Sequence, residues 1–209
     1  MRKTLGLCPN PHLRPFFEKK GLKNFQKAFK RIFCEVSSNR FMYHKYYLSK
    51  FPPSQTDDSW TFASNGLNSV ADIGKEYGTY VLDEHEYYRM EMKYCEAILL
   101  ICEHFKVNCL RIMRLEKFGF CGEKIAYPQE LLSFYDSLVE GSLIDAENFS
   151  NICRLGLREN LWCFLYAQTV HFNLAFDYDY YISIVCEKIP DAIVQKILDL
   201  GLYLELAEA

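Results

Sequence analysis

Three consecutive runs rich in aromatic and β-branched residues lie in the C-terminal third of this chain, and they constrain its fold more than any other feature. The runs cover Leu161–Ala167, Val170–Phe176 and Tyr180–Cys186, and only a few residues separate each from the next. Such composition is typical of β-strands. Connections this short can join antiparallel strands but are too short for parallel ones. The segment therefore predicts an antiparallel meander.

A long helical pattern precedes these strands. Asp83 can cap a helix that runs to about Phe105, and Glu84 and Glu86 in its first turn lie at the positive end of the helix dipole. Apolar residues advance by three or four, as a core-facing stripe does. The stripe comprises Tyr87, Met90, Tyr94, Ile98, Ile101 and Phe105.

The remaining pattern adds further elements of both kinds. We expect helices over Pro128–Glu140, Asp145–Glu159 and Pro190–Leu200, and strands over Trp60–Ala63, Tyr77–Leu82, Leu110–Leu115 and Leu202–Leu206. Strands grouped in adjacent runs are typical of an α+β domain rather than of a doubly wound sheet. We therefore predict an antiparallel sheet of about five to six strands packed with about three to four helices.

Charge divides the chain into two parts. Met1 to Lys50 carries 12 Lys and Arg residues against two acidic residues, whereas Phe51 to Ala209 carries 12 against 25, so that +10 and −13 sum to the formal −3. A proline pair and a polar cluster between Phe51 and Asp58 mark a loop. We expect a basic N-terminal extension over residues 1–55 and an acidic α+β domain over residues 56–209. The acidic surplus favours a cationic partner and repels nucleic acid.

The basic extension contains an amphipathic pattern over residues 15–34. Phe17, Phe25, Phe29 and Phe33 lie near one stripe, and lysines surround it. Such a helix can bind a membrane surface, nucleic acid or an acidic protein surface, or it can pack on the rest of its own chain.

Cysteine usage and hydropathy indicate a cytoplasmic protein. The nine cysteines form no CxxC pair and scatter over apolar positions, which fits a reducing compartment. The longest apolar runs, such as Ala97–Cys102, fall far short of the roughly 20 residues that cross a bilayer. We therefore predict no transmembrane segment.

Residues typical of catalysis are few. His85 lies among Asp83, Glu84 and Glu86, but no second histidine follows four residues later, as the zinc-protease helix requires. The position of His85 in an exposed first helical turn accounts for this histidine without a catalytic role. The glycines lack the spacing of a nucleotide-binding loop. We predict no catalytic residue, metal site or cofactor; a hydrolase that uses His85 or a Cys/His pair is the weakest alternative.

Carboxylates and phenols alternate in the densest local feature, which runs from Asp177 to Tyr181. In a strand, Asp177 and Asp179 face one side, and Tyr178 and Tyr180 face the other. Tyrosines give large contact area at low entropic cost, and paired acids accept Lys or Arg from a partner. Two alternatives remain: a divalent cation held by the aspartates, and tyrosines in the core with aspartates in a turn.

The same segment resembles a known family. Phe176 to Ile184 is similar to an aromatic strand of bacterial immunity proteins from contact-dependent inhibition and related polymorphic toxin systems. Asp177 stands where that strand has glycine, and Ser183 where it has tyrosine. Further stretches are similar in the same order, so the resemblance covers residues 60–206. They are Gly66–Asp72, Tyr77–Tyr80, Glu84–Tyr88, Leu157–Cys163 and Gly201–Glu205.

The resemblance implies a non-catalytic cytoplasmic protein that binds one cognate toxin domain, often a nuclease, and blocks it. Basic nuclease surfaces suit an acidic inhibitor. We predict that the partner is contacted by Asp177, Tyr178, Asp179 and Tyr180, with Glu84 and Glu86 as further candidates. The alternative function is a nucleic-acid or membrane-surface adaptor that acts through the basic helix at residues 14–34.

Overall fold

The computed structural model describes residues 43–53, 69–77, 79–120, 125–167, 169–177 and 180–207. The chain divides into two compact units, residues 1–42 and 43–209, and all the described residues belong to the second. The basic helix that we predict over residues 15–34 and the strand that we predict over residues 60–63 lie outside the described residues.

One seven-stranded antiparallel sheet forms the centre of the domain, in the order β5-β4-β6-β7-β8-β1-β9. The predicted meander is confirmed as β6-β7-β8, and the predicted α+β class is confirmed with slightly more strands than expected. The strands are β1 (His44–Ser49), β4 (Cys109–Lys117), β5 (Leu143–Asp145), β6 (Leu161–Ala167), β7 (Phe172–Phe176), β8 (Ile182–Cys186) and β9 (Tyr203–Leu206).

A separate hairpin replaces one predicted strand. Where we expect a strand over residues 77–82, the chain instead forms β2 (Glu76–Tyr77) and β3 (Tyr80–Val81), which pair with each other. The glycine at position 78 lies between them, and glycine in a strand pattern favours a turn or bulge.

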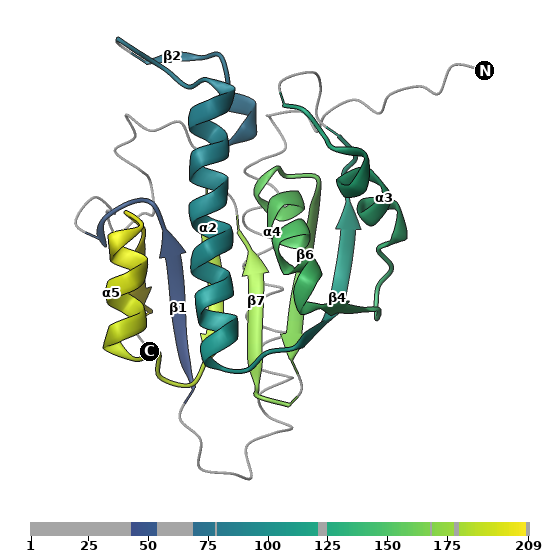
Figure 1. The fold of residues 1–209 in the computed structure, drawn as a ribbon, viewed down its shortest axis with the longest axis vertical. Helices are drawn as coiled ribbons and strands as arrows, with labels where there is room; N and C mark the ends of the chain where they lie inside the picture. The colour runs from purple at the N-terminus through teal and green to yellow at the C-terminus, as the bar shows by residue number, and fades with distance from the viewer. Residues whose placement is uncertain are drawn as a thin grey trace. The chain divides into compact units, whose positions relative to one another are not determined.

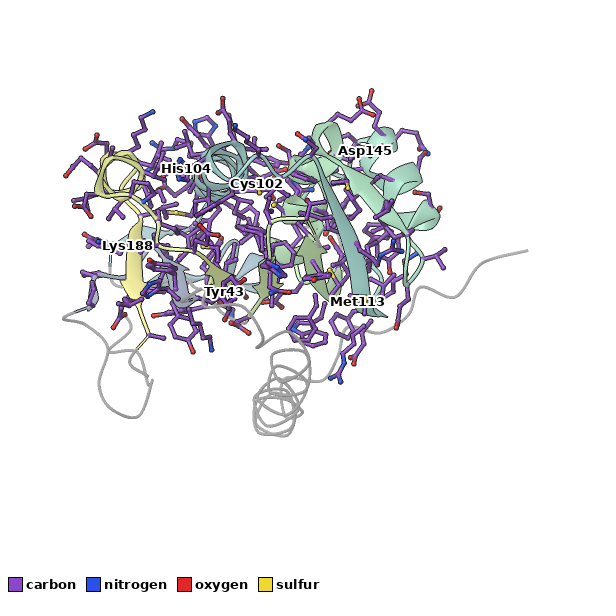
Figure 2. All side chains as sticks on the ribbon, turned by 90° about the horizontal axis from the view of Figure 1, so that it is seen from below. Tyr43, Cys102, His104, Met113, Asp145 and Lys188 are labelled. Atoms are coloured by element: carbon purple, nitrogen blue, oxygen red, sulfur yellow. The ribbon has the colours of Figure 1, made fainter. Side chains whose placement is uncertain are left out.

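Figure 1 shows α2, α4 and α5 on one face of the sheet. Figure 2, which is turned by 90°, shows the helices on one side of the sheet, seen along its edge. The described helices are α2 (Glu84–His104), α3 (Gln129–Ser137), α4 (Phe149–Leu157) and α5 (Asp191–Asp199), with the short 3-10 helices η3 (Val70–Asp72) and η4 (Ala146–Asn148). The predicted helix over residues 145–159 is shorter than expected, because Asp145 ends β5 and the α-helix begins only at Phe149.

The start and the core-facing stripe of α2 agree with the sequence. The Asp83 carboxylate accepts a hydrogen bond from the Glu86 N–H at 2.7 Å, which caps the helix. Four of the six predicted stripe residues are buried, and Met90 and Phe105 are partly buried against them.

α4 lies very close to β7 because Gly156 carries no side chain. A Cβ at that position would lie 2.4 Å from the Phe176 ring, which is closer than packed atoms approach. This approach fixes α4 on the sheet, and with it the two arginines at positions 154 and 158.

β1 is an interior strand next to the edge strand β9, although it precedes every other described strand. It pairs with β8 on one side and with β9 on the other. A boundary near residue 55, which charge and the proline pair predict, assigns β1 to the extension. The compact unit that contains β1 begins at Tyr43.

Among the described helices, none combines the length and the apolar composition needed to cross a membrane. The six cysteines within the described ranges are free thiols, and five of them are buried.

Candidate functional site

Tyr180, one of the predicted partner contacts, points into the domain. It is 5% exposed, and its ring stacks on Tyr94 at a centroid distance of 5.5 Å. The Tyr94 hydroxyl donates to the Tyr180 carbonyl at 2.6 Å. The backbone of Tyr180 is in the left-handed region, with φ of 63°, which bulky residues adopt only when packing holds them there. Its role as a partner contact remains a prediction.

Asp177 follows β7, and its carboxylate is occupied within the domain. The Ser183 hydroxyl donates to Asp177 Oδ2, and the Asp177 N–H donates to the Tyr181 carbonyl at 2.8 Å. Burial raises the pKa of the Asp177 carboxyl, while the Ser183 hydrogen bond and the charge of Lys45 act to lower it. The two positions that depart from the family's strand pattern are therefore bonded to each other.

Of the other four predicted contacts, the structure describes two. Tyr178 and Asp179 are outside the described residues. Glu84 and Glu86 are partly exposed in the first turn of α2, as we expect. Glu84 accepts a hydrogen bond from the Ala126 N–H at 3.2 Å, and Glu86 forms an ion pair with its neighbour Arg89.

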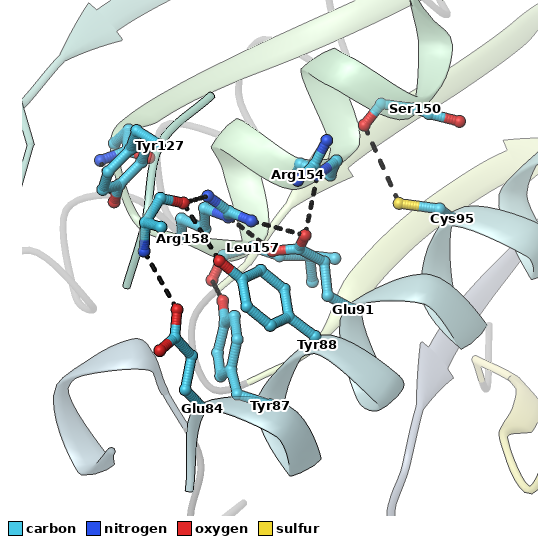
Figure 3. Close-up of polar contacts among 12 residues, drawn as sticks. Glu84, Tyr87, Tyr88, Glu91, Cys95, Tyr127, Ser150, Arg154, Leu157 and Arg158 are labelled. Carbon is cyan, nitrogen blue, oxygen red and sulfur yellow. Dashed lines mark hydrogen bonds and ion pairs between the residues drawn. The ribbon is translucent and has the colours of Figure 1, made fainter. Parts of the chain in front are cut away.

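A buried ion-pair network, which the sequence analysis did not predict, joins α2 to α4 (Figure 3). Glu91 is 2% exposed and Arg158 is fully buried. Arg158 Nε and Nη2 donate to the two Glu91 oxygens at 2.6 and 2.8 Å, and Arg154 Nε donates to Glu91 Oε1 at 2.9 Å. Such a fork-to-fork pair is strong and directional.

Arg158 is held on its remaining sides as well. Its Nη1 donates to the Ala126 carbonyl at 3.1 Å, and its guanidinium lies 5.4 Å from the Tyr88 ring centroid and 5.0 Å from that of Tyr127. Burial acts to lower the pKa of Arg158, but hydrogen bonds and charge from Glu91 outweigh it and raise that pKa. These groups bind one another, so the network is suited to holding α2, α4 and residues 125–128 together.

One sequence signal could have revealed this network. Glu91 lies four residues after Tyr87 and seven before Ile98, which places a carboxylate on the apolar stripe of α2. A carboxylate on a core-facing stripe requires a cationic partner inside the protein.

Exposed acidic side chains gather between Ile125 and Cys153. This stretch contains five acidic residues and no Lys or Arg, all five are exposed, and none forms an ion pair with a described residue. We call this stretch the acidic edge; it comprises Glu130, Asp136, Glu140, Asp145 and Glu147 on α3, the following loop, β5 and η4. A count of charge along the chain would have found it.

Apolar side chains accompany these acids. Val139 is 63% exposed and Leu143 is 55% exposed, whereas Ile144 between Leu143 and Asp145 is buried. Across the β4–β5 pair, Arg111 faces Leu143 and donates from Nη1 to the Gly141 carbonyl at 2.6 Å. Exposed apolar area beside unpaired charge is typical of a protein-binding surface.

Metal-binding clusters and hollows are the features of the described residues that bear on catalysis. No group of three His, Cys, Asp or Glu side chains within them is placed to hold a metal ion. A small hollow, with room for about one water molecule, is lined by Asp177 and Tyr180 and also by Glu159 and Phe176. Neither histidine nor cysteine contributes to its lining.

Comparisons of the chain with protein-family models, with curated proteins and with solved structures found no match.

Proposed function

We propose that this chain is a non-catalytic immunity protein that binds and neutralises a cognate basic toxin domain of the nuclease type in the cytoplasm. The observation that carries the proposal is the acidic edge, because its five exposed carboxylates lack ion-pair partners among the described residues. Unpaired surface charge of one sign accelerates association with a partner of opposite charge. The strand resemblance at Phe176–Ile184 supports the same function.

In this proposal the predicted contacts act together with the acidic edge. Glu84 bonds to Ala126, so the first turn of α2 adjoins the beginning of the stretch that lacks Lys and Arg. Asp177 and Tyr180 flank Tyr178 and Asp179 in the sequence and are themselves anchored in the domain. In this proposal Tyr178 and Asp179, which lie between these two residues in the sequence, supply partner contacts.

Neutralisation follows from competition. A nuclease binds phosphates through Lys and Arg side chains, and an acidic protein that pairs with the same side chains excludes the nucleic acid. The inhibited complex should therefore weaken as salt concentration rises.

The test requires a candidate toxin domain, which is sought in the reading frames next to this one. The full chain should inhibit that toxin's activity, and Asp145→Lys combined with Glu147→Lys should slow association by about tenfold or more at low salt. The matched control is Glu96→Lys with Glu103→Lys, which makes the same charge change on the exposed face of α2.

The outcomes separate two errors. If the wild-type chain neither binds nor inhibits the toxin, the proposed function is wrong. If inhibition holds but both double variants slow association equally, the acidic edge is not the contact surface.

A further inference from the structure

Among the described strands, β5 lies at one end of the seven-stranded sheet and pairs with β4 alone. Ser142 and Ala146 bond to β4, since the Ile112 N–H donates to the Ser142 carbonyl at 2.9 Å and the Ala146 N–H donates to the Asn108 carbonyl at 3.1 Å. Backbone groups of an antiparallel strand alternate between its two sides. Leu143 and Asp145 therefore direct their backbone groups away from β4, where another strand can bond to them.

The side chains of β5 also alternate. Ile144 is buried in the core, while Leu143 and Asp145 are exposed on the opposite face. A strand added beside β5 would place alternate residues next to Ile144 and the others next to Leu143 and Asp145. An apolar residue suits the first position, and a basic residue suits the second, because a Lys or Arg stem can cover Leu143 while its charge reaches Asp145.

Charge selects among the possible occupants of this edge. Glu140 precedes β5 and Glu147 follows it, so both ends of the strand are acidic. A second copy of the chain would place another strand with acidic ends beside the first, which like charge disfavours. A basic strand meets complementary charge at each end.

We propose that β5 binds an extended, basic segment of the toxin partner as an eighth strand of the sheet. This inference rests on the proposed function and specifies its binding mode, which is β-strand addition with backbone hydrogen bonds for affinity and charge for selectivity. β5 spans about 10 Å, so the added strand is one part of a larger interface.

The first test needs no toxin. The full chain is titrated with a hexapeptide of alternating lysine and valine, and amide hydrogen exchange is followed by NMR. The Leu143 and Asp145 amides should exchange about tenfold more slowly at a peptide concentration ten times its Kd. A hexapeptide of alternating glutamate and valine should have no effect.

Two variants sharpen the result. Leu143→Pro removes an N–H that faces away from β4, so pairing with β4 should survive while peptide protection at Asp145 is lost. Asp145→Lys keeps the whole backbone and should also abolish protection by the lysine peptide, which covers the case in which the proline variant fails to fold.

Several outcomes overturn the inference. These are equal protection by both peptides, protection at sites other than β5, and protection without peptide. In the last case, dependence on protein concentration assigns the edge to a second copy, and independence assigns it to this chain's own basic segment.

The toxin then distinguishes the two proposals. If the wild-type chain inhibits the toxin and both β5 variants inhibit it equally well, the strand-addition mode is wrong while the immunity function holds. If no toxin is inhibited but the lysine peptide protects β5, the function fails and the basic-strand site remains.

Discussion

The Glu91–Arg158 network and the acidic edge use the same chemical groups in opposite ways. In the network Glu91 and Arg158 are buried, Arg154 is partly buried, and each charged group is bonded to another group of this chain. At the acidic edge five carboxylates face solvent without an ion-pair partner among the described residues. A charge that is paired inside the domain stabilises the fold, whereas an exposed charge without an ion-pair partner is available to bind another molecule.

The largest effect should come from neutralising Glu91. Glu91→Gln leaves the fully buried Arg158 charge without compensation, so we expect a loss of about 3–5 kcal/mol in the free energy of unfolding. Urea denaturation measures it. Glu103→Gln, an exposed change on the same helix, should stay within about 0.5 kcal/mol.

Removing both Glu91 and Arg158 should lower the free energy of unfolding less than removing Glu91 alone. Glu91→Met with Arg158→Met leaves no buried charge between these two positions, and the double variant should be more stable than Glu91→Gln. A double variant that is less stable would mean that this pair is itself a major source of stability.

A smaller loss should follow Arg158→Lys. Lysine keeps the charge but cannot form two parallel bonds to Glu91 or lie flat between Tyr88 and Tyr127. We expect about 1–3 kcal/mol of destabilisation in the same assay. A neutral result would show that charge alone, without the planar fork, satisfies Glu91.

The Asp177 carboxyl should make the stability of the domain depend on pH. Burial raises the pKa of its carboxyl in the folded state, so the folded protein holds this proton more tightly than the unfolded chain does. The resulting stability is full below the ordinary aspartate pKa and is lost as pH rises through the raised value. Asp177→Asn should therefore gain stability relative to wild type as pH rises from 3 towards 7, by no more than about 1 kcal/mol. A parallel pair of pH curves would exclude the shift.

The smallest effect on stability should come from the acidic edge. Asp145→Asn with Glu147→Gln neutralises two exposed carboxylates and should change the unfolding free energy by no more than about 0.5 kcal/mol. The binding of this double variant to a basic partner should nevertheless be weaker than that of the wild type. A large loss of stability would assign these acids to the fold and remove the contrast with Glu91.

Local patterns in the sequence predicted the elements that depend on local interactions. The Asp83 cap, the apolar stripe of α2 and the β6-β7-β8 meander are confirmed because caps, helix faces and short connections are set by neighbouring residues. The predicted start of α4 at Asp145 was wrong. Aspartate is typical of a helix cap, but this residue pairs with Cys109 in β5.

Features that depend on distant partners were beyond such patterns. From the sequence we place His44–Ser49 in the basic extension and predict no strand there, because the pairing of β1 depends on β8 and β9, which lie more than 130 residues later. Glu91 and Arg158 are 67 residues apart, so spacing gives no sign of their bond. The contact role of Asp177 and Tyr180 remains a prediction, while their anchoring depends on Ser183 and on the distant Tyr94.

The place of β1 in the sheet also sets the order of events during synthesis. His44–Ser49 leaves the ribosome early, but both of its neighbours belong to the last quarter of the chain. The sheet cannot close until translation has passed Leu206, and the nascent chain carries an unmatched strand until then. Such long-range pairing is slow and exposes the growing polypeptide to aggregation, so chaperones have a long interval in which to act.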